Sequence, residues 1–314
     1  MNIKALDKGI HFLLLFTFLV FISGSCVSDN KGKEGNSADS SGLSDDFDAN
    51  ADEDLTEKIN TAKRIFYSLP SPLETAMLIK NAGADYDGDL LNKVENTTKY
   101  NTNLKMALNL GIYTTDLSYA SLFDQTQATL SYINAAKKMA DGLEILDAID
   151  QATITRLEEN INNRDVIIDI ISETLLNSSS FLEDKGLQNT SAIILVGGWV
   201  EGLHIATSLV KTGADLQKNK LVERIVDQKL SLNIVVSLLE NNKDNAEVQV
   251  LLKDVAELKA IYDKITIEQS EITPVEDPNT NVTVLKSEST IKITQEVFDE
   301  LSRKVKELRT RYIS

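Results

Sequence analysis

Proline is absent from the whole stretch between Pro72 and Pro274, and this absence constrains the fold more than any other feature of the sequence. Proline breaks helices, but it is common in the turns that a sheet protein needs after each short strand. Glycine, the other usual turn residue, is also sparse, with 14 in 314 residues. We therefore expect an all-α, multi-helix bundle, with stacked, repeat-like helix pairs as the alternative arrangement.

Helix-start and helix-stop residues divide this bundle into predicted helices. A capping box with proline at the first helical position, Ser71-Pro72-Leu73-Glu74, begins one helix, and Gly83 ends it. An irregular stretch, 84–98, follows. The other helices expected within a single domain, 55–314, are 55–68, 101–111, 115–140, 144–162, 164–185, 190–211, 214–241 and 246–267.

The apolar period changes from helical to alternating near the C-terminus. Val282, Val284, Ile291 and Ile293 alternate with polar residues on either side of Ser287-Glu288-Ser289. This alternation predicts a small β-hairpin or an extended arm within 273–293. A final amphipathic helix, 294–312, is expected after it, with its apolar face formed by Val297, Leu301, Val305 and Leu308.

The N-terminus has the pattern of a bacterial lipoprotein signal. Lys4 and Lys8 precede an apolar run, 13–22, and three small residues lead to Cys26, which is the only cysteine. We expect 1–25 to be a signal peptide and Cys26 to be the lipid (palmitate) attachment site, although Ser23 stands where such signals usually carry leucine. The alternative is an uncleaved anchor helix within 9–27. Lipid on Cys26 would exclude disulfides and zinc-thiolate sites, because no other thiol exists.

Residues 26–54 are rich in Ser, Gly, Asn and Asp, and they predict an acidic flexible tether between the lipid and the domain. Val27 after the cysteine, in place of the Asp that favours inner-membrane retention, points to the outer membrane, on its periplasmic face or at the cell surface. The net charge of −16 repels nucleic acid, so we expect no nucleic-acid partner.

One predicted helix is apolar nearly all round, which requires either protein or lipid on every side. It covers 191–210 and contains a Gly-x-x-x-Gly pair, Gly198 and Gly202, that allows another helix to approach closely. A transmembrane helix is one interpretation, but Glu201 would lie near its middle at a cost of about 3 kcal/mol. We favour the central helix of a soluble bundle.

Glu201 and His204 are three residues apart on that helix and therefore share a face. Di-iron bundles use this Glu-x-x-His spacing on two helices, but His204 is the only histidine after the predicted signal. A single zinc bound by His204 and carboxylates is one interpretation. The other is a core histidine bonded to Glu201 or to a backbone carbonyl, and we expect no metal and no cofactor.

A second candidate lies on the predicted helix 115–140. Residues spaced seven apart, Ile112, Tyr119, Thr126 and Ile133, form a coiled-coil-like seam that includes Asp116. A buried carboxylate needs a donor, and Tyr113, Tyr119 or Tyr132 could supply a hydroxyl. Asp116 is thus either a structural polar contact or an acid facing a ligand. The candidate ligand-binding or buried polar residues are Tyr113, Asp116, Tyr119, Trp199, Glu201 and His204.

The sequence lacks a phosphate-binding glycine loop, a Gly-x-Ser-x-Gly elbow, a His-Glu-x-x-His pair and an EF-hand loop. Several segments resemble an uncharacterised family of helical lipoproteins from the Bacteroidota: Ser71-Pro-Leu-Glu74, Gly83 with Tyr86, Lys99-Tyr-Asn-Thr102, Ala107 to Tyr113, Asp116-Leu-Ser-Tyr119 and Gly197-Gly-Trp-Val-Glu201. The resemblance implies an all-α periplasmic or surface domain and carries no catalytic residues.

From these observations we expect a lipid-anchored, non-enzymatic binding or scaffold protein whose partner is an envelope protein or glycan. The alternative is a small-ligand or metal-binding periplasmic protein with a pocket near Asp116 and Glu201/His204.

Overall fold

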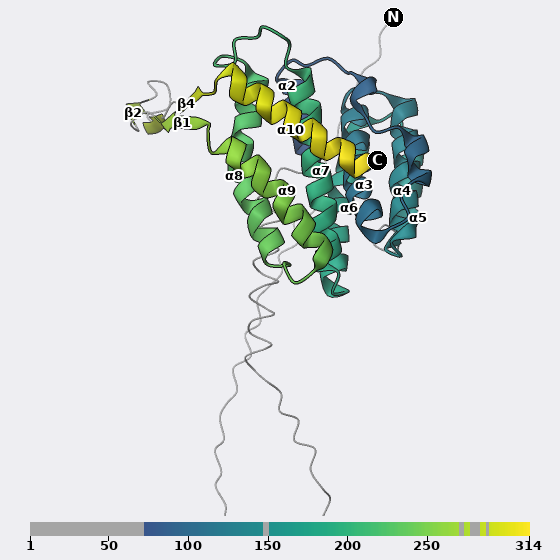
Figure 1. The fold of residues 1–314 in the computed structure, drawn as a ribbon. Coiled ribbons are helices and arrows are strands. Elements are labelled where there is room, and N and C mark those ends of the chain that lie inside the picture. The colour runs from purple at the N-terminus through teal and green to yellow at the C-terminus, as the bar shows by residue number, and fades with distance from the viewer. Residues whose placement is uncertain (1–71, 147–150, 270–272, 277–282, 287–288) are drawn as a thin grey trace, which may run out of the picture. The chain divides into compact units, whose positions relative to one another are not determined.

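Helices form almost all of the described fold, so the prediction of an all-α multi-helix bundle is confirmed (Figure 1). The computed structural model describes residues 72–146, 151–269, 273–276, 283–286 and 289–314. The α-helices are α2 Pro72–Asn81, α3 Asn103–Leu122, α4 Thr126–Gly142, α5 Gln151–Glu159, α6 Arg164–Asp184, α7 Gln188–Leu209, α8 Lys220–Glu240, α9 Ala246–Tyr262 and α10 Gln295–Ile313. Two 3-10 helices, η1 Gly88–Leu90 and η2 Val94–Thr98, lie between α2 and α3.

The predictions for the N-terminal part fall outside the described residues. They are the signal 1–25, the lipid site Cys26, the tether 26–54, the helix 55–68 and the capping residue Ser71. The predicted end of the next helix is described, because α2 ends at Asn81 and Gly83 has a φ of 82°. Glycine adopts this left-handed conformation without the steric penalty of a side chain.

Helix α7 lies at the centre of the bundle and contacts α2, α3, α6, α8, α9 and α10. Every residue from Val196 to Thr207 is buried, including the polar Glu201 and His204. α7 is long and apolar enough to cross a membrane, but 78% of its most apolar window is buried by the rest of the protein. Its uniformly apolar surface is thus covered by other helices, as expected for a bundle core.

Helices α3 and α7 approach each other so closely that backbone contacts backbone. A Cβ atom on Gly197 would collide with the Leu108 carbonyl oxygen, and one on Gly111 would collide with the Ile194 carbonyl oxygen. The two glycines of the Gly198 and Gly202 pair face different helices. Gly198 faces Thr115 on α3, whereas Gly202 faces Thr75 on α2. The close approach brings the polar residues of α3 next to those of α7.

The predicted break at 112–114 is wrong, because Gly111 lies inside α3, where the contact with α7 requires it. The chain turns instead at Asp124, which has a φ of 58°, so the predicted seven-residue seam is divided between α3 and α4. Glu144, expected to begin a helix, also has a φ of 58° and lies in a turn. α8 begins at Lys220 rather than at 214, because the Asn219 side chain accepts the amides of Leu221 and Val222.

The C-terminal hairpin consists of two nested antiparallel pairs. β1 Thr266–Gln269 pairs with β4 Ser289–Lys292, and β2 Thr273–Glu276 pairs with β3 Thr283–Lys286. The prediction of helix up to 267 is therefore too long, since α9 ends at Tyr262. α10 follows β4 and crosses α9 and α7 towards α3, as Figure 1 shows in yellow. Of its predicted apolar face, Leu301, Val305 and Leu308 are fully buried and Val297 is half-buried.

Candidate functional site

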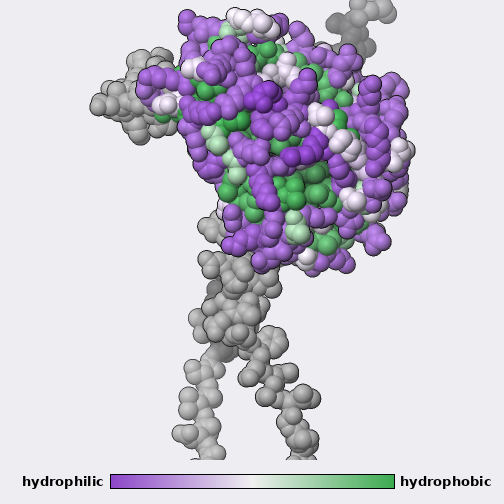
Figure 2. Space-filling view, in the orientation of Figure 1, coloured by the Kyte–Doolittle hydropathy of each residue, from purple (hydrophilic) through white to green (hydrophobic). Residues whose placement is uncertain are grey.

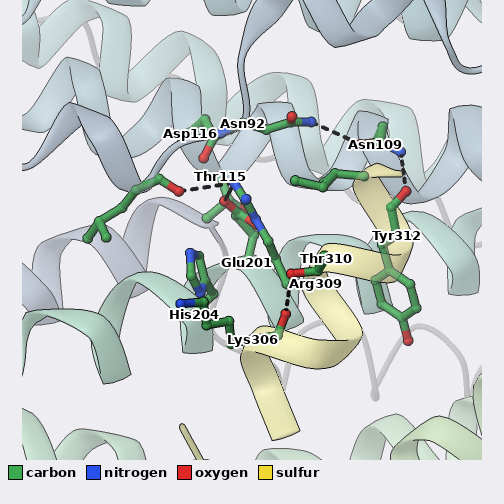
Figure 3. Close-up of polar contacts among 12 residues, drawn as sticks. Asn92, Asn109, Thr115, Asp116, Glu201, His204, Lys306, Arg309, Thr310 and Tyr312 are labelled. Atoms are coloured by element: carbon green, nitrogen blue, oxygen red, sulfur yellow. Dashed lines mark hydrogen bonds and ion pairs between the residues drawn. The ribbon is translucent and has the colours of Figure 1, made fainter. Parts of the chain in front are cut away.

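A buried ion pair between Glu201 of α7 and Arg309 of α10 forms the centre of the polar cluster in Figure 3. Arg309 Nε donates to Glu201 Oε2 at 3.0 Å, and Arg309 Nη2 donates to Glu201 Oε1 at 3.1 Å. Arg309 Nη2 also donates to the Leu90 carbonyl at 3.0 Å. The Glu201 side chain is 0% exposed and that of Arg309 is 12% exposed. This two-point geometry is the strongest that a carboxylate and a guanidinium can form.

Asp116 of α3 lies beside this pair and is also completely buried. Its Oδ2 accepts the Asn92 backbone amide at 3.1 Å, while no donor in the described part of the chain reaches its Oδ1. Burial raises the pKa of Asp116 well above its ordinary value, the charge of Glu201 raises it further, and Arg309 opposes the shift. A proton on Asp116 would form a hydrogen bond to Glu201, which explains why no other donor is needed.

His204 lies one helical turn after Glu201 and is 7% exposed. Burial lowers its pKa, and the nearby Arg309 lowers it too, whereas Glu201 and a hydrogen bond with the Leu90 backbone raise it. His204 is therefore a neutral ring bonded to a backbone carbonyl, which agrees with the core-histidine interpretation. Its Nδ1 has no hydrogen-bond partner among the described residues.

A chain of amide side chains joins this cluster to the end of α10. Asn92 Nδ2 donates to Tyr100 Oη and to Asn109 Oδ1, both at 3.0 Å, and Asn109 Nδ2 donates to the Tyr312 carbonyl at 3.0 Å (Figure 3). Tyr100 Oη in turn donates to the Ile313 carbonyl at 3.2 Å. The carbonyls in the last turn of α10, which have no partners within the helix, are therefore bonded to side chains from α3 and the preceding loop.

The sequence offers Tyr113, Tyr119 or Tyr132 as the donor to Asp116, but the hydroxyls of Tyr113 and Tyr119 bind the backbone of the loop that follows α2. Tyr113 donates to the Lys93 carbonyl at 3.0 Å, and Tyr119 donates to the Asp85 carbonyl at 3.1 Å. Burial raises the pKa of both phenols, that of Tyr119 to about 12. These tyrosines hold the loop against α3, and the donor to Asp116 is the loop's own backbone.

Trp199 does not belong to the cluster, because it lies on the opposite face of α7. Its Nε1 donates to Gln228 Oε1 on α8 at 3.2 Å. A hollow with a volume of about 20 Å³ lies beside it, lined by residues of α2, α7 and α8 that include Thr75, Leu203 and Ile225. This volume accommodates about one water molecule, so the hollow is too small for an organic ligand.

The described residues contain no group of three His, Cys, Asp or Glu side chains placed to hold a metal ion. Glu201 and His204 do share a face, as the spacing predicted, but both Glu201 oxygens are bonded to Arg309. The position that a cation would take beside Glu201 is filled by a guanidinium. Chemically, the cluster can hold a proton and bind α10 to α3 and α7.

Sequence reasoning did not identify Arg309, Asn92 or Asn109. Arg309 follows Val305 by four residues and precedes Tyr312 by three, so it falls on the apolar face of α10. A charged residue on the buried face of an amphipathic helix indicates a buried ion pair, and that signal was present. Asn92 has no comparable signal, because it lies in irregular structure.

Comparison with protein-family models, with curated proteins and with solved structures gives no match for this chain. The resemblance to helical lipoproteins of the Bacteroidota therefore stays a prediction from the sequence.

Proposed function

We propose that this chain is an exported, lipid-anchored helical protein that acts as a non-enzymatic binding or scaffold component of the cell envelope. The observation that carries the proposal is that Glu201, Tyr113 and Tyr119 of the predicted site are bonded to other groups of the protein. Glu201 uses both carboxylate oxygens on Arg309, and Tyr113 and Tyr119 are bonded to backbone carbonyls. A catalytic group must reach a substrate, whereas these groups reach only the protein.

The outer surface also supports a binding role. Figure 2 shows a mostly hydrophilic surface with a hydrophobic area below α10, over the part of α7 that lies between α9 and α3. Contiguous apolar surface on a soluble domain commonly marks a contact site for another molecule. The lipid at Cys26 would keep that surface close to the membrane, where an envelope protein or glycan partner is available.

The lipid anchor is tested by expressing the full-length chain and its Cys26→Ser variant, then measuring the intact mass of each after detergent extraction. We expect the wild-type mass to lack residues 1–25 and to include acyl chains. The mass of the Cys26→Ser variant should include no acyl chains. Ser28→Ala is the matched control and should behave as wild type. A wild-type mass that includes residues 1–25 without acyl chains would contradict the proposal.

A small-ligand or metal-binding role is the second candidate, because two buried atoms in one cluster, Asp116 Oδ1 and His204 Nδ1, have no partner among the described residues. Metal analysis of the detergent-extracted full-length protein separates the two candidates. Stoichiometric metal that disappears in His204→Gln but persists in a control variant, Asp263→Asn at the surface, would favour this second role over the first.

A further inference from the structure

We propose that Asp116 and Glu201 hold a single proton between them, and that this proton controls the docking of α10, so that α10 is released from α3 and α7 as the pH rises. This device uses residues that the proposed function leaves without a role. It depends on neither the lipid anchor nor a partner.

The first argument is a charge count. Asp116 and Glu201 are both completely buried, and the guanidinium of Arg309 is the cation bonded to Glu201. One carboxylate and one guanidinium balance each other. A second carboxylate in the same dry space would be uncompensated, and an isolated buried charge is far more costly than a neutral acid.

The second argument is the hydrogen-bond count of Asp116. Its Oδ2 accepts the Asn92 amide, while its Oδ1 is buried without a donor among the described residues. The Asp116 carboxyl group lies within side-chain hydrogen-bonding reach of Glu201, and an ionised carboxylate can only accept a hydrogen bond. A proton on Oδ1 makes Asp116 the donor and Glu201 the acceptor, which satisfies both groups together.

The third argument is that the neighbouring titratable groups do not supply a second positive charge to balance the second carboxylate. His204 on α7 is kept neutral by burial, and burial also raises the pKa of Tyr86, Tyr113 and Tyr132, which face Asp116 from the loop, α3 and α4. Lys306 on α10 is exposed to solvent. Among the described residues, Arg309 is therefore the permanent positive charge that lies against the two carboxylates.

Loss of the proton should affect the docking of α10, because Arg309 belongs to that helix. Asn92, which donates to Asp116, is also connected to the last turn of α10 through Asn109. Loss of the shared proton leaves two facing carboxylates. Helix α10 contacts α3 and α7 and crosses in front of α7 (Figure 1), so movement of α10 away from them would admit water to the two carboxylates. Opening of α10 would thus relieve the repulsion.

The direction of the pH effect follows from the raised pKa of Asp116. The docked state binds this proton above pH 3.8, where an exposed aspartate has already lost it. Docking therefore weakens with rising pH, by up to about tenfold in the opening equilibrium per pH unit, until the pH passes the raised pKa of Asp116. Below pH 3.8 both states are protonated and the effect disappears.

The test is hydrogen exchange measured by mass spectrometry on the full chain between pH 5 and pH 9, with rates divided by the intrinsic rate at each pH. We expect protection of the α10 peptides to fall by about tenfold per pH unit over part of this range in the wild type. Asp116→Asn should remove this dependence, because asparagine can donate to Glu201 and accept from Asn92 at every pH.

Two further variants keep the test decisive. Glu201→Gln should also remove the pH dependence, because Asp116 would become the sole carboxylate beside Arg309. Asp254→Asn, which changes a different buried carboxylate bonded to α10, should retain it. Equal pH dependence in wild type and Asp116→Asn, or no pH dependence in the wild type, would overturn the proposal.

Discussion

Helix α10 brings two arginines to two buried carboxylates, and the two sites differ in how their charges balance. At the first, Arg309 meets Glu201 with Asp116 alongside, and the arginine side chain is 12% exposed. At the second, Arg311 meets Asp254 of α9, and the arginine side chain is 52% exposed. Asp254 also accepts the Tyr312 hydroxyl at 3.0 Å, so it retains a donor if the arginine leaves.

From this difference we expect that burial of the cation, more than the presence of an ion pair, decides how much each arginine contributes to the free energy of unfolding. Half-exposed Arg311 is screened by water, and exposed pairs contribute at most about 1 kcal/mol. Removing one partner of a fully buried pair leaves an uncompensated charge and is strongly destabilising. Three substitutions test this contrast.

The largest effect is expected for Arg309→Met, which removes the cation and leaves Glu201 buried without it. The free energy of unfolding should fall by about 3–5 kcal/mol. Urea unfolding followed by the fluorescence of Trp199, the single tryptophan, measures this. The double variant Glu201→Gln/Arg309→Met should recover part of the loss, and a double variant less stable than the single one would contradict the buried-charge explanation.

An intermediate effect is expected for Gly197→Ala, which places a methyl group against the Leu108 carbonyl and forces α3 away from α7. We expect a loss of about 1–3 kcal/mol in the free energy of unfolding. The disturbance should reach the Glu201 site and spare the Asp254 site, as seen by hydrogen exchange in α7 and α9. Gly142→Ala meets only the flexible Met106 side chain and is the near-neutral control.

The smallest effect is expected for Arg311→Met. Because its side chain is 52% exposed and Tyr312 still donates to Asp254, the loss should stay below about 1 kcal/mol. The same urea titration measures it against Arg309→Met. Similar losses in the two variants would show that the two sites do not differ as the exposures indicate.

Much of the fold could be predicted from local sequence. The absence of proline predicted helices, the uniformly apolar segment predicted the central position of α7, and the spacing of Val297, Leu301, Val305 and Leu308 predicted the buried face of α10. These are properties that a helix shows within its own residues. The turn at Asp124 was missed and Glu144 was wrongly expected to begin a helix, because left-handed conformations at residues other than glycine have little local signal.

The candidate site was only partly predictable. The shared face of Glu201 and His204 follows from helix geometry, and the burial of Asp116 was expected on a seam that proved to be divided between two helices. The identity of their partners does not follow from local sequence. Arg309 is separated from Glu201 by 108 residues, and only the path of α10 across α7 brings them together. The interpretation of Trp199 as part of the same pocket failed because it points to α8.

That separation along the chain also affects how the protein is made. A growing polypeptide that has reached α9 already contains Glu201 and Asp116 but not the arginine that neutralises them, and the 108 residues take about 5–20 s to synthesise at bacterial and eukaryotic rates. During that interval Glu201 lacks the cation that it is bonded to in the complete fold. Completion of the buried ion pair therefore depends on α10, the last helix of the chain to be made.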